Sequence, residues 1–351
     1  MEVFSGWWPN GHVQGIAVDR EKGFVYFSFT TVLVKTDMQG QLVGSVKRLA
    51  GHLGCIDFDP EKRRVYGSLE LKHDVIGKGI INRTGWDPSG EDNFYLVSFD
   101  ADAIDRMDMD AEKDGVMKAV WLRDPVVDYA GIDPVSGKKH IYGCSGIDAT
   151  AIGPVFGGAE TKLMIAYGVY SDVDRQDNDH QIIMQFDRSV IDEYGQPLNQ
   201  EHPHHSGPEK AQQRYFLYTG NTRYGMQNLC YEPSTGLWLA AVYKGQKPAF
   251  GNFPMFLIDG SKKPEMQKLK GRNEEGLTLH LAPIGTQDDM GVWGVDFPYG
   301  STGIAAVGDG TIWFSHNMKN EQDGTFACNM VLYKFLDGNL KKCLDKQDKC
   351  C

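Results

Sequence analysis

The sequence predicts an all-β fold, a five-bladed β-propeller with four antiparallel strands in each blade; six blades are the alternative. Glycine accounts for 41 of the 351 residues and aromatic residues for 11%, which is typical of many short strands joined by tight turns. An apolar hairpin pattern also recurs along the chain at the length of one propeller blade. No linker divides the sequence, so we expect one domain over residues 1–351, with 340–351 as a loosely ordered tail.

The repeat is clearest between residues 12–28 and 52–68, which align without gaps at a spacing of 40 residues. Each copy has an apolar strand, a polar turn and a second apolar strand, the pattern of a β-hairpin. Further copies fall at 224–242 and 300–315, and a degraded fifth copy begins at 143 and resumes at 162. Five copies predict five blades.

The segments between the hairpins supply the two outer strands that each blade needs. The N-terminal residues 3–5 are expected to pair with the last blade and close the ring, which removes exposed sheet edges. The expected outer strands are 32–37 and 42–46 in blade one, 94–99 and 116–121 in blade two, 181–186 and 214–218 in blade three, 255–259 and 277–281 in blade four, and 329–335 with a strand near Leu340 in blade five.

The first repeat resembles the blades of NHL-type and SMP-30/gluconolactonase-type propellers. The likeness is carried by Gly15-Ile16-Ala17-Val18-Asp19, by Gly23-Phe24-Val25-Tyr26-Phe27 and by Thr36-Asp37-Met38-Gln39-Gly40. It covers about one blade and implies the propeller architecture. SMP-30-like lactonases are expected to place a metal-binding Glu ahead of a Gly-Pro in the first inner strand, where this sequence has His12-Val13-Gln14-Gly15. The resemblance therefore implies the fold and not an inherited lactonase site.

The charge and the apolar pattern exclude some classes of partner. The formal net charge is -11, which opposes nucleic acid as a partner because phosphate binding needs clustered Lys and Arg. The sequence has no run of about 18 apolar residues and no signal-peptide pattern at its start. We therefore expect no membrane partner and a cytoplasmic protein.

The seven cysteines are an odd number. Cys55, Cys144 and Cys230 fall within apolar strand-like segments, where a free thiol behaves as a small buried hydrophobe. We expect these three in the core, and we assign no function to the cysteines of the C-terminal tail.

In a propeller the residues that enter each first strand and those that join the second and third strands converge on one channel mouth. The catalytic candidates at these positions are groups that can exchange a proton, and the substrate-binding candidates are other polar and aromatic side chains. The catalytic candidates are His52, Glu70, His12 and His316. The substrate-binding candidates are Gln14, Lys72, His73, Tyr170, Tyr224, Gln227, Tyr243, Lys244, Thr302 and Asn317.

Four carboxylates are candidate ligands of a divalent cation, with calcium as the first choice. Asp57 and Asp148 occupy the strand position that is alanine in other copies, and the alternative is that they accept hydrogen bonds from neighbouring groups. Asp172 and Asp174 lie in an acidic loop that is not an EF-hand, and the alternative there is simple solvation.

The sequence contains no Gly-x-Ser-x-Gly elbow, no Gly-x-x-x-x-Gly-Lys loop and no His-Glu-x-x-His helix, so the commonest hydrolase, NTPase and zinc-protease signatures are absent. The leading hypothesis is a hydrolase, lactonase or lyase acting on a small, sugar-like ligand at the channel mouth. The alternative is a non-catalytic propeller whose loops bind a protein or a glycan.

Overall fold

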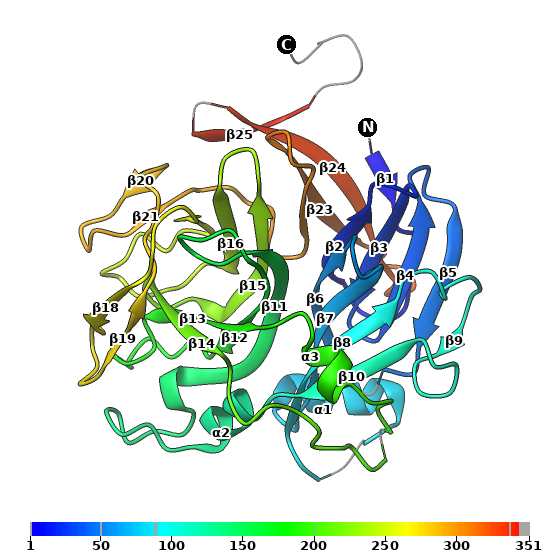
Figure 1. Cartoon of the computed structure of the whole chain (residues 1–351), viewed down its shortest axis with the longest axis horizontal. Coiled ribbons are helices and arrows are strands. Elements are labelled where there is room, and N and C mark those ends of the chain that lie inside the picture. Colours follow the sequence, from blue (N-terminus) through cyan, green and yellow to red (C-terminus); the bar gives the residue numbers. More distant parts are fainter. Residues whose placement is uncertain (1, 50, 88–89, 200, 337, 344–351) are drawn as a thin grey trace.

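The computed structural model describes residues 2–49, 51–87, 90–199, 201–336 and 338–343. Within these ranges the chain is a five-bladed β-propeller with few helices, as the sequence predicts (Figure 1). No helix in the described ranges has the length and apolar character needed to cross a bilayer.

Each blade is one antiparallel meander that starts with a strand at the centre of the ring. Blade one contains β2 (Val13–Asp19), β3 (Phe24–Phe29), β4 (Val32–Asp37) and β5 (Leu42–Lys47); blade two contains β6 (His52–Asp59), β7 (Arg64–Leu71), β8 (Asn93–Asp100) and β10 (Met117–Trp121). Blade three contains β11 (Cys144–Pro154), β12 (Thr161–Val169), β13 (His180–Phe186) and β14 (Gln213–Tyr218); blade four contains β15 (Arg223–Glu232), β16 (Leu237–Tyr243) and β17 (Met255–Asp259). Blade five contains β22 (Ile304–Ala306), β23 (Thr311–Lys319) and β24 (Phe326–Leu336).

The first strands of the blades form a closed inner ring. β2 packs against β6, β6 against β11, β11 against β15, β15 against β22 and β22 against β2. Every first strand runs in the same direction along the axis of the ring. The residues that begin these strands therefore meet at one end of the ring. This is the arrangement on which the candidate site depends.

Buried acids at the ends of three inner strands link three of the blades to the blade that follows. Asp19 of blade one accepts a hydrogen bond from Arg63 of blade two at 2.6 Å, and Asp59 of blade two pairs with Arg188 of blade three at 3.1 Å. Glu232 of blade four accepts from two glycine N–H groups in the β22–β23 turn of blade five. A hydrogen bond to a buried charged group is stronger than one between neutral groups. Because these acids stand at the same position of the repeat, they help to hold neighbouring blades at a regular spacing.

The ring closes as the sequence predicts. β1 (Glu2–Phe4) pairs with β24 in antiparallel register, and Val3 is fully buried opposite Met330. β25 (Asn339–Lys342) pairs with the other half of β24, so that strand carries partners from both ends of the chain. Figure 1 shows β1 (blue) beside β24 (red).

The outer part of blade four differs from the prediction. Residues 277–281 were expected as its fourth strand, but β19 (Glu275–Thr278) pairs in parallel with β14 and extends blade three, with β18 (Glu265–Lys268) at its outer edge. Residues 280–282 run beside β17, through Asp259 N–H to His280 O and Ala282 N–H to Leu257 O, and Val295 N–H donates to Met255 O at the start of that strand. The free edge of β14 captures the segment because it offers unpaired backbone groups.

The remaining elements are short. Blade one gains β9 (Met109–Asp110) at its edge, and β20 (Thr286–Gln287) pairs with β21 (Trp293–Gly294). The helices are α1 (Val75–Thr84), α2 (Arg123–Ala130), α3 (Val190–Tyr194) and the 3-10 turn η1 (Ile141–Gly143). The thiols of Cys55, Cys144 and Cys230 are free and buried, as expected.

Candidate functional site

A cavity of about 820 Å³ lies at the end of the inner ring where the first strands begin. We call it the axial cavity. It is lined by the starts of β2, β6, β11 and β15, by the ends of β7 and β16, and by one side of α1. The sequence-predicted residues that line it are His12, Gln14, His52, Glu70, Lys72, Asp148, Tyr170, Tyr224, Gln227, Tyr243 and Lys244.

His52, Glu70 and Asp148 form the chemical centre of the axial cavity. Nδ1 of His52 lies 3.5 Å from a Glu70 carboxylate oxygen and 3.6 Å from an Asp148 carboxylate oxygen. That nitrogen is buried and has no hydrogen-bond partner. Since buried polar atoms normally find a partner, this one marks a place where a proton or a cation belongs.

The backbone of blade three is shaped to fit Glu70. The N–H of Ile147 donates to Glu70 Oε1 at 2.8 Å. The preceding residue is Gly146, with φ of 124°, and a Cβ there would lie 1.9 Å from the same oxygen. Only glycine therefore lets β11 approach the carboxylate closely enough for this bond.

Lys72 provides a buried positive charge beside this centre. Its ammonium donates to Glu70 Oε2 at 2.7 Å and to Ser145 O at 2.8 Å, and lies 3.6 Å from Asp74. Burial alone would lower the pKa of Lys72, but the carboxylates of Glu70, Asp74 and Asp148 hold that pKa above its usual value. One ammonium thus faces several buried carboxylates.

The excess negative charge is centred on Asp148. Burial raises the pKa of this carboxyl well above its usual value, and the nearby charge of Glu70 raises it further. Gln227 donates a hydrogen bond to its second oxygen at 2.9 Å and opposes that rise. The site therefore favours the uptake of a positive charge next to Asp148.

The centre fits a divalent cation. One ligand atom from each of His52, Glu70 and Asp148 lies within 4.8 Å of the other two, and this is the one such group of three among the described residues. Ligand atoms held about 2.1 Å from a common tetrahedral ion lie about 3.4 Å apart, close to the two His52 distances. A set with an imidazole nitrogen suits zinc or another transition metal, whereas calcium prefers oxygen ligands.

The rim of the cavity carries neutral and aromatic groups. Burial lowers the pKa of His12 to about 4, and the charges of His52 and Arg83 add to this effect. His12 is therefore neutral near pH 7, and its Nε2 lies 3.4 Å from the hydroxyl of Tyr243. Burial raises the pKa of Tyr243 to about 12, so this hydroxyl keeps its proton.

Helix α1 covers one side of the cavity and was not predicted. Asp74 caps its first turn through Gly77 N–H, and the same side chain accepts the Tyr170 hydroxyl at 2.8 Å. Gly85 ends the helix in the left-handed conformation with φ of 70°. An acidic N-cap and a glycine after the last turn are helix signals that the sequence contains.

Two arginines that line the cavity also escaped prediction. Arg83 comes from the last turn of α1 and Arg223 from the start of β15. No carboxylate of the described residues lies within ion-pair distance of either guanidinium. They give the rim a positive character above an acidic floor.

Four of the predicted catalytic and substrate-binding residues lie outside the lining of the cavity. His316 stacks on Tyr299, with ring centroids 3.6 Å apart. His73 contacts two carboxylates of its own loop, those of Asp87 and Asp92. Thr302 bonds to Ser315 and Asn317 donates to Val13 O, so both support the inner ring.

Asp57 also lies away from the axial centre. Its two oxygens accept the N–H groups of Ile152 and Phe58, both at 2.8 Å. Burial raises the pKa of this carboxyl to about 7. The contact with Ile152 links blades two and three, which matches the hydrogen-bonding alternative for this residue.

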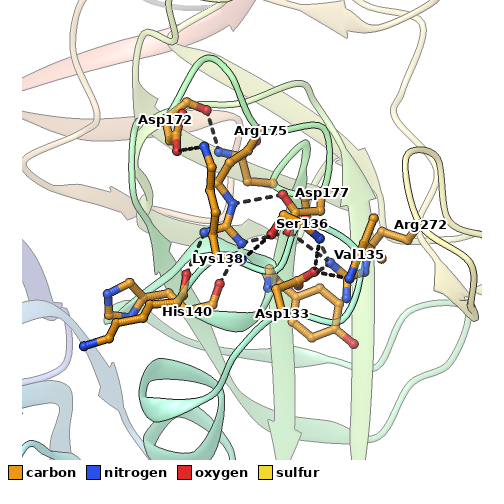
Figure 2. Close-up of polar contacts among 12 residues, drawn as sticks. Asp133, Val135, Ser136, Lys138, His140, Asp172, Arg175, Asp177 and Arg272 are labelled. Carbon is orange, nitrogen blue, oxygen red and sulfur yellow. Dashed lines mark hydrogen bonds and ion pairs between the residues drawn. The ribbon is translucent and has the colours of Figure 1, made fainter.

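The acidic loop is neutralised by basic side chains (Figure 2). Asp172 accepts from Lys138 at 2.7 Å, and Asp177 accepts from Arg175 at 2.8 Å. Asp174 bonds through its backbone N–H to Asp172. In this arrangement Asp172 and Asp174 belong to no cluster of three potential metal ligands within the described residues, and the network instead fixes the loop that carries Tyr170.

Comparisons with known proteins assign no family to the chain. No protein-family model matches the chain, and no curated protein matches it. Similar solved structures include a functionally unknown protein from Desulfotomaculum acetoxidans (12% identity, TM-score 0.38, covering 95% of this chain and 69% of the other). A family 43 β-1,3-galactosidase with galactodeoxynojirimycin is 12% identical, with a TM-score of 0.44, and the match covers 97% of this chain and 95% of the other. The pyranose dehydrogenase PQQ domain from Coprinopsis cinerea is 8% identical, with a TM-score of 0.40, and the match covers 90% of this chain and 81% of the other. At these scores none of them bears on the chemistry of the cavity.

Proposed function

We propose that the chain is an enzyme that acts on a small, sugar-derived substrate in the axial cavity by hydrolysis, lactone opening or elimination. The observation that carries this proposal is the buried group of His52, Glu70 and Asp148 on the floor of a cavity of about 820 Å³. Pockets of this size hold small-molecule ligands. A buried group of titratable side chains with a shifted pKa at the bottom of such a pocket is characteristic of active sites.

The floor residues would hold a divalent transition cation through the imidazole of His52 and the carboxylates of Glu70 and Asp148. When bound, such an ion polarises a substrate oxygen or activates a water molecule. Lys72 and Ile147 hold Glu70 in place through its two oxygens, and the oxygen that Lys72 contacts is also the one nearest His52. Gln227 does the same for Asp148.

The rim residues would bind and orient the substrate. Neutral His12 can accept a proton from a substrate hydroxyl or carbon, since its pKa of about 4 leaves one nitrogen unprotonated near pH 7. The hydroxyl of Tyr243 lies beside it as a donor. Arg83 and Arg223 would attract a carboxylate or phosphate group on the substrate, because both guanidinium groups face the cavity without an ion pair from the described residues.

The test is a panel of sugar lactones, glycosides and uronate-containing saccharides, assayed with metal-free protein and after reloading with Zn²⁺ or Mn²⁺. We expect turnover of one class, dependent on the added metal. His52→Ala and Glu70→Gln should lower that turnover by at least about a hundredfold in protein that still unfolds cooperatively. Glu70→Gln should also lose stability, because it leaves the buried Lys72 without that carboxylate. His202→Ala and Glu209→Gln, at two exposed positions outside the cavity, serve as matched controls.

Full activity of His52→Ala and Glu70→Gln would refute the proposed site. A protein that turns over none of these classes but binds a protein or glycan through the same face would instead support the non-catalytic alternative.

A further inference from the structure

A second cavity of about 320 Å³ lies on the outer side of blades three and four. We call it the lateral cavity. It is formed by β18, β19 and the β20–β21 pair together with the facing ends of β13 and β14. No residue lines both this cavity and the axial one. The strands β18 and β19, which extend blade three instead of completing blade four, thus help to form a separate cavity.

The lining of the lateral cavity is positively charged, although the chain as a whole carries a formal net charge of -11. Lys262, Lys268 and Lys270 line it, and no Asp or Glu of the described residues does. Lys262 lies 3.7 Å from Asp259, whereas within the described ranges no carboxylate is within 4 Å of Lys268 or Lys270. Glu265 contacts the lining residues His280 and Gln267. The unpaired positive charge therefore rests on Lys268 and Lys270, and such a pair of cations attracts an anion.

His180 provides an independent sign of a ligand. Its side chain lines the cavity, is 3% exposed, and has an Nδ1 atom with no hydrogen-bond partner. Burial lowers its pKa to about 4, with further contributions from the charges of Arg272 and Lys270. The imidazole is therefore neutral at pH 7 and can accept one hydrogen bond and donate another. A buried polar atom without a partner needs an explanation, and a bound hydroxyl group would supply one.

The other lining residues suit a ring that bears hydroxyl groups. Trp293 and Tyr218 offer aromatic surface, and the ammonium of Lys270 lies 4.1 Å from the centre of the Tyr218 ring. Gln267 and Gln287 add amide donors and acceptors at the exposed edge. Apolar ring faces combined with a few polar groups are the usual composition of small-molecule sites.

We propose that the lateral cavity is a second binding site, specific for a saccharide unit that carries a carboxylate or a sulfate group. Lys268 and Lys270 bind the anionic group, His180 binds a ring hydroxyl, and Trp293 packs against the ring. The site is independent of the axial cavity and does not require the proposed catalytic activity.

The test is calorimetric titration of the full chain carrying Arg83→Gln and Arg223→Gln, which removes the two axial residues proposed to bind an anion and leaves the lateral cavity unchanged. The probes are D-galacturonate, D-galactose 6-sulfate and neutral D-galactose. We expect at least one of the two acidic sugars to bind. The sugar that binds more tightly identifies the preferred anion. Lys268→Gln with Lys270→Gln should weaken that binding roughly tenfold, a loss of about 1.4 kcal/mol.

The matched control is Lys210→Gln with Lys341→Gln, which changes the net charge equally at two exposed lysines outside both cavities. This variant should bind as tightly as the parent. Equal binding of neutral galactose, unchanged binding in the Lys268/Lys270 variant, or no binding of either acidic sugar would overturn the proposal. Because every measurement uses the Arg83→Gln/Arg223→Gln background, failure here is distinct from failure of the axial site.

Discussion

Lys72→Met removes the buried positive charge beside the axial centre and keeps a side chain of similar length. The Lys72 side chain is 4% exposed and its partner Glu70 is 1% exposed. In the variant Glu70 loses a 2.7 Å charged hydrogen bond, and Ser145 O loses its donor. Both acceptors remain buried without replacement.

The expected loss is about 3–5 kcal/mol of unfolding free energy, the range for breaking one partner of a buried ion pair. The surface pair of Lys62 and Asp192 provides the scale for comparison, since its atoms are 3.0 Å apart but its side chains are 43% and 59% exposed. Lys62→Met should therefore cost no more than about 1 kcal/mol.

The assay is urea unfolding at equilibrium, with a chelator present so that no cation replaces the missing ammonium. The double variant Lys72→Met with Glu70→Gln removes the orphaned charge as well and should recover part of the lost stability. A Lys72→Met variant as stable as Lys62→Met, or a double variant less stable than Lys72→Met alone, would refute the reasoning about this charge.

Two further predictions concern the fold that positions the site. Because the pKa of Asp57 is raised from its usual 3.8 to about 7, its contribution to stability is present below the unfolded-state pKa and lost as pH rises through about 7. The stability of Asp57→Asn relative to the parent should therefore improve between pH 4.5 and 7.5 in urea titrations, and a constant difference would contradict this. Val3→Asp buries a charge in the closing strand and should lower the melting temperature far more than Phe4→Asp, since Val3 is fully buried and Phe4 is 37% exposed; equal losses would argue against closure by β1.

Much of the fold could be predicted because its information is local. The hairpins at 12–28 and 52–68 carry their own alternation and turn chemistry, and they form β2–β3 and β6–β7, with Asp19 and Asp59 at equivalent strand ends. The error in blade four was non-local. Residues 277–281 read as a strand, but which sheet edge they join depends on the free edge of β14, far away in sequence.

The candidate site could be predicted where the repeat itself sets the position. His12 and His52 occupy equivalent entries into two inner strands, Gln227 lies in the first half of a third, and all three line the axial cavity. His316 lies in the second strand of blade five, at a position that the repeat predicts to face the channel mouth. Its ring instead stacks on Tyr299, which belongs to a loop outside the repeat. Arg83 was missed because it lies on α1, an insertion between β7 and β8 that no other blade shares.

The most direct test of the account is anomalous diffraction from crystals of the full chain soaked in Zn²⁺. We predict a peak about 2.1 Å from His52 Nδ1 and from one carboxylate oxygen each of Glu70 and Asp148, and its loss in His52→Ala. Crystals with no peak at these three residues, in which Lys72 still bonds Glu70 and Asp148 still bonds Gln227, would contradict the central claim that this floor holds a cation.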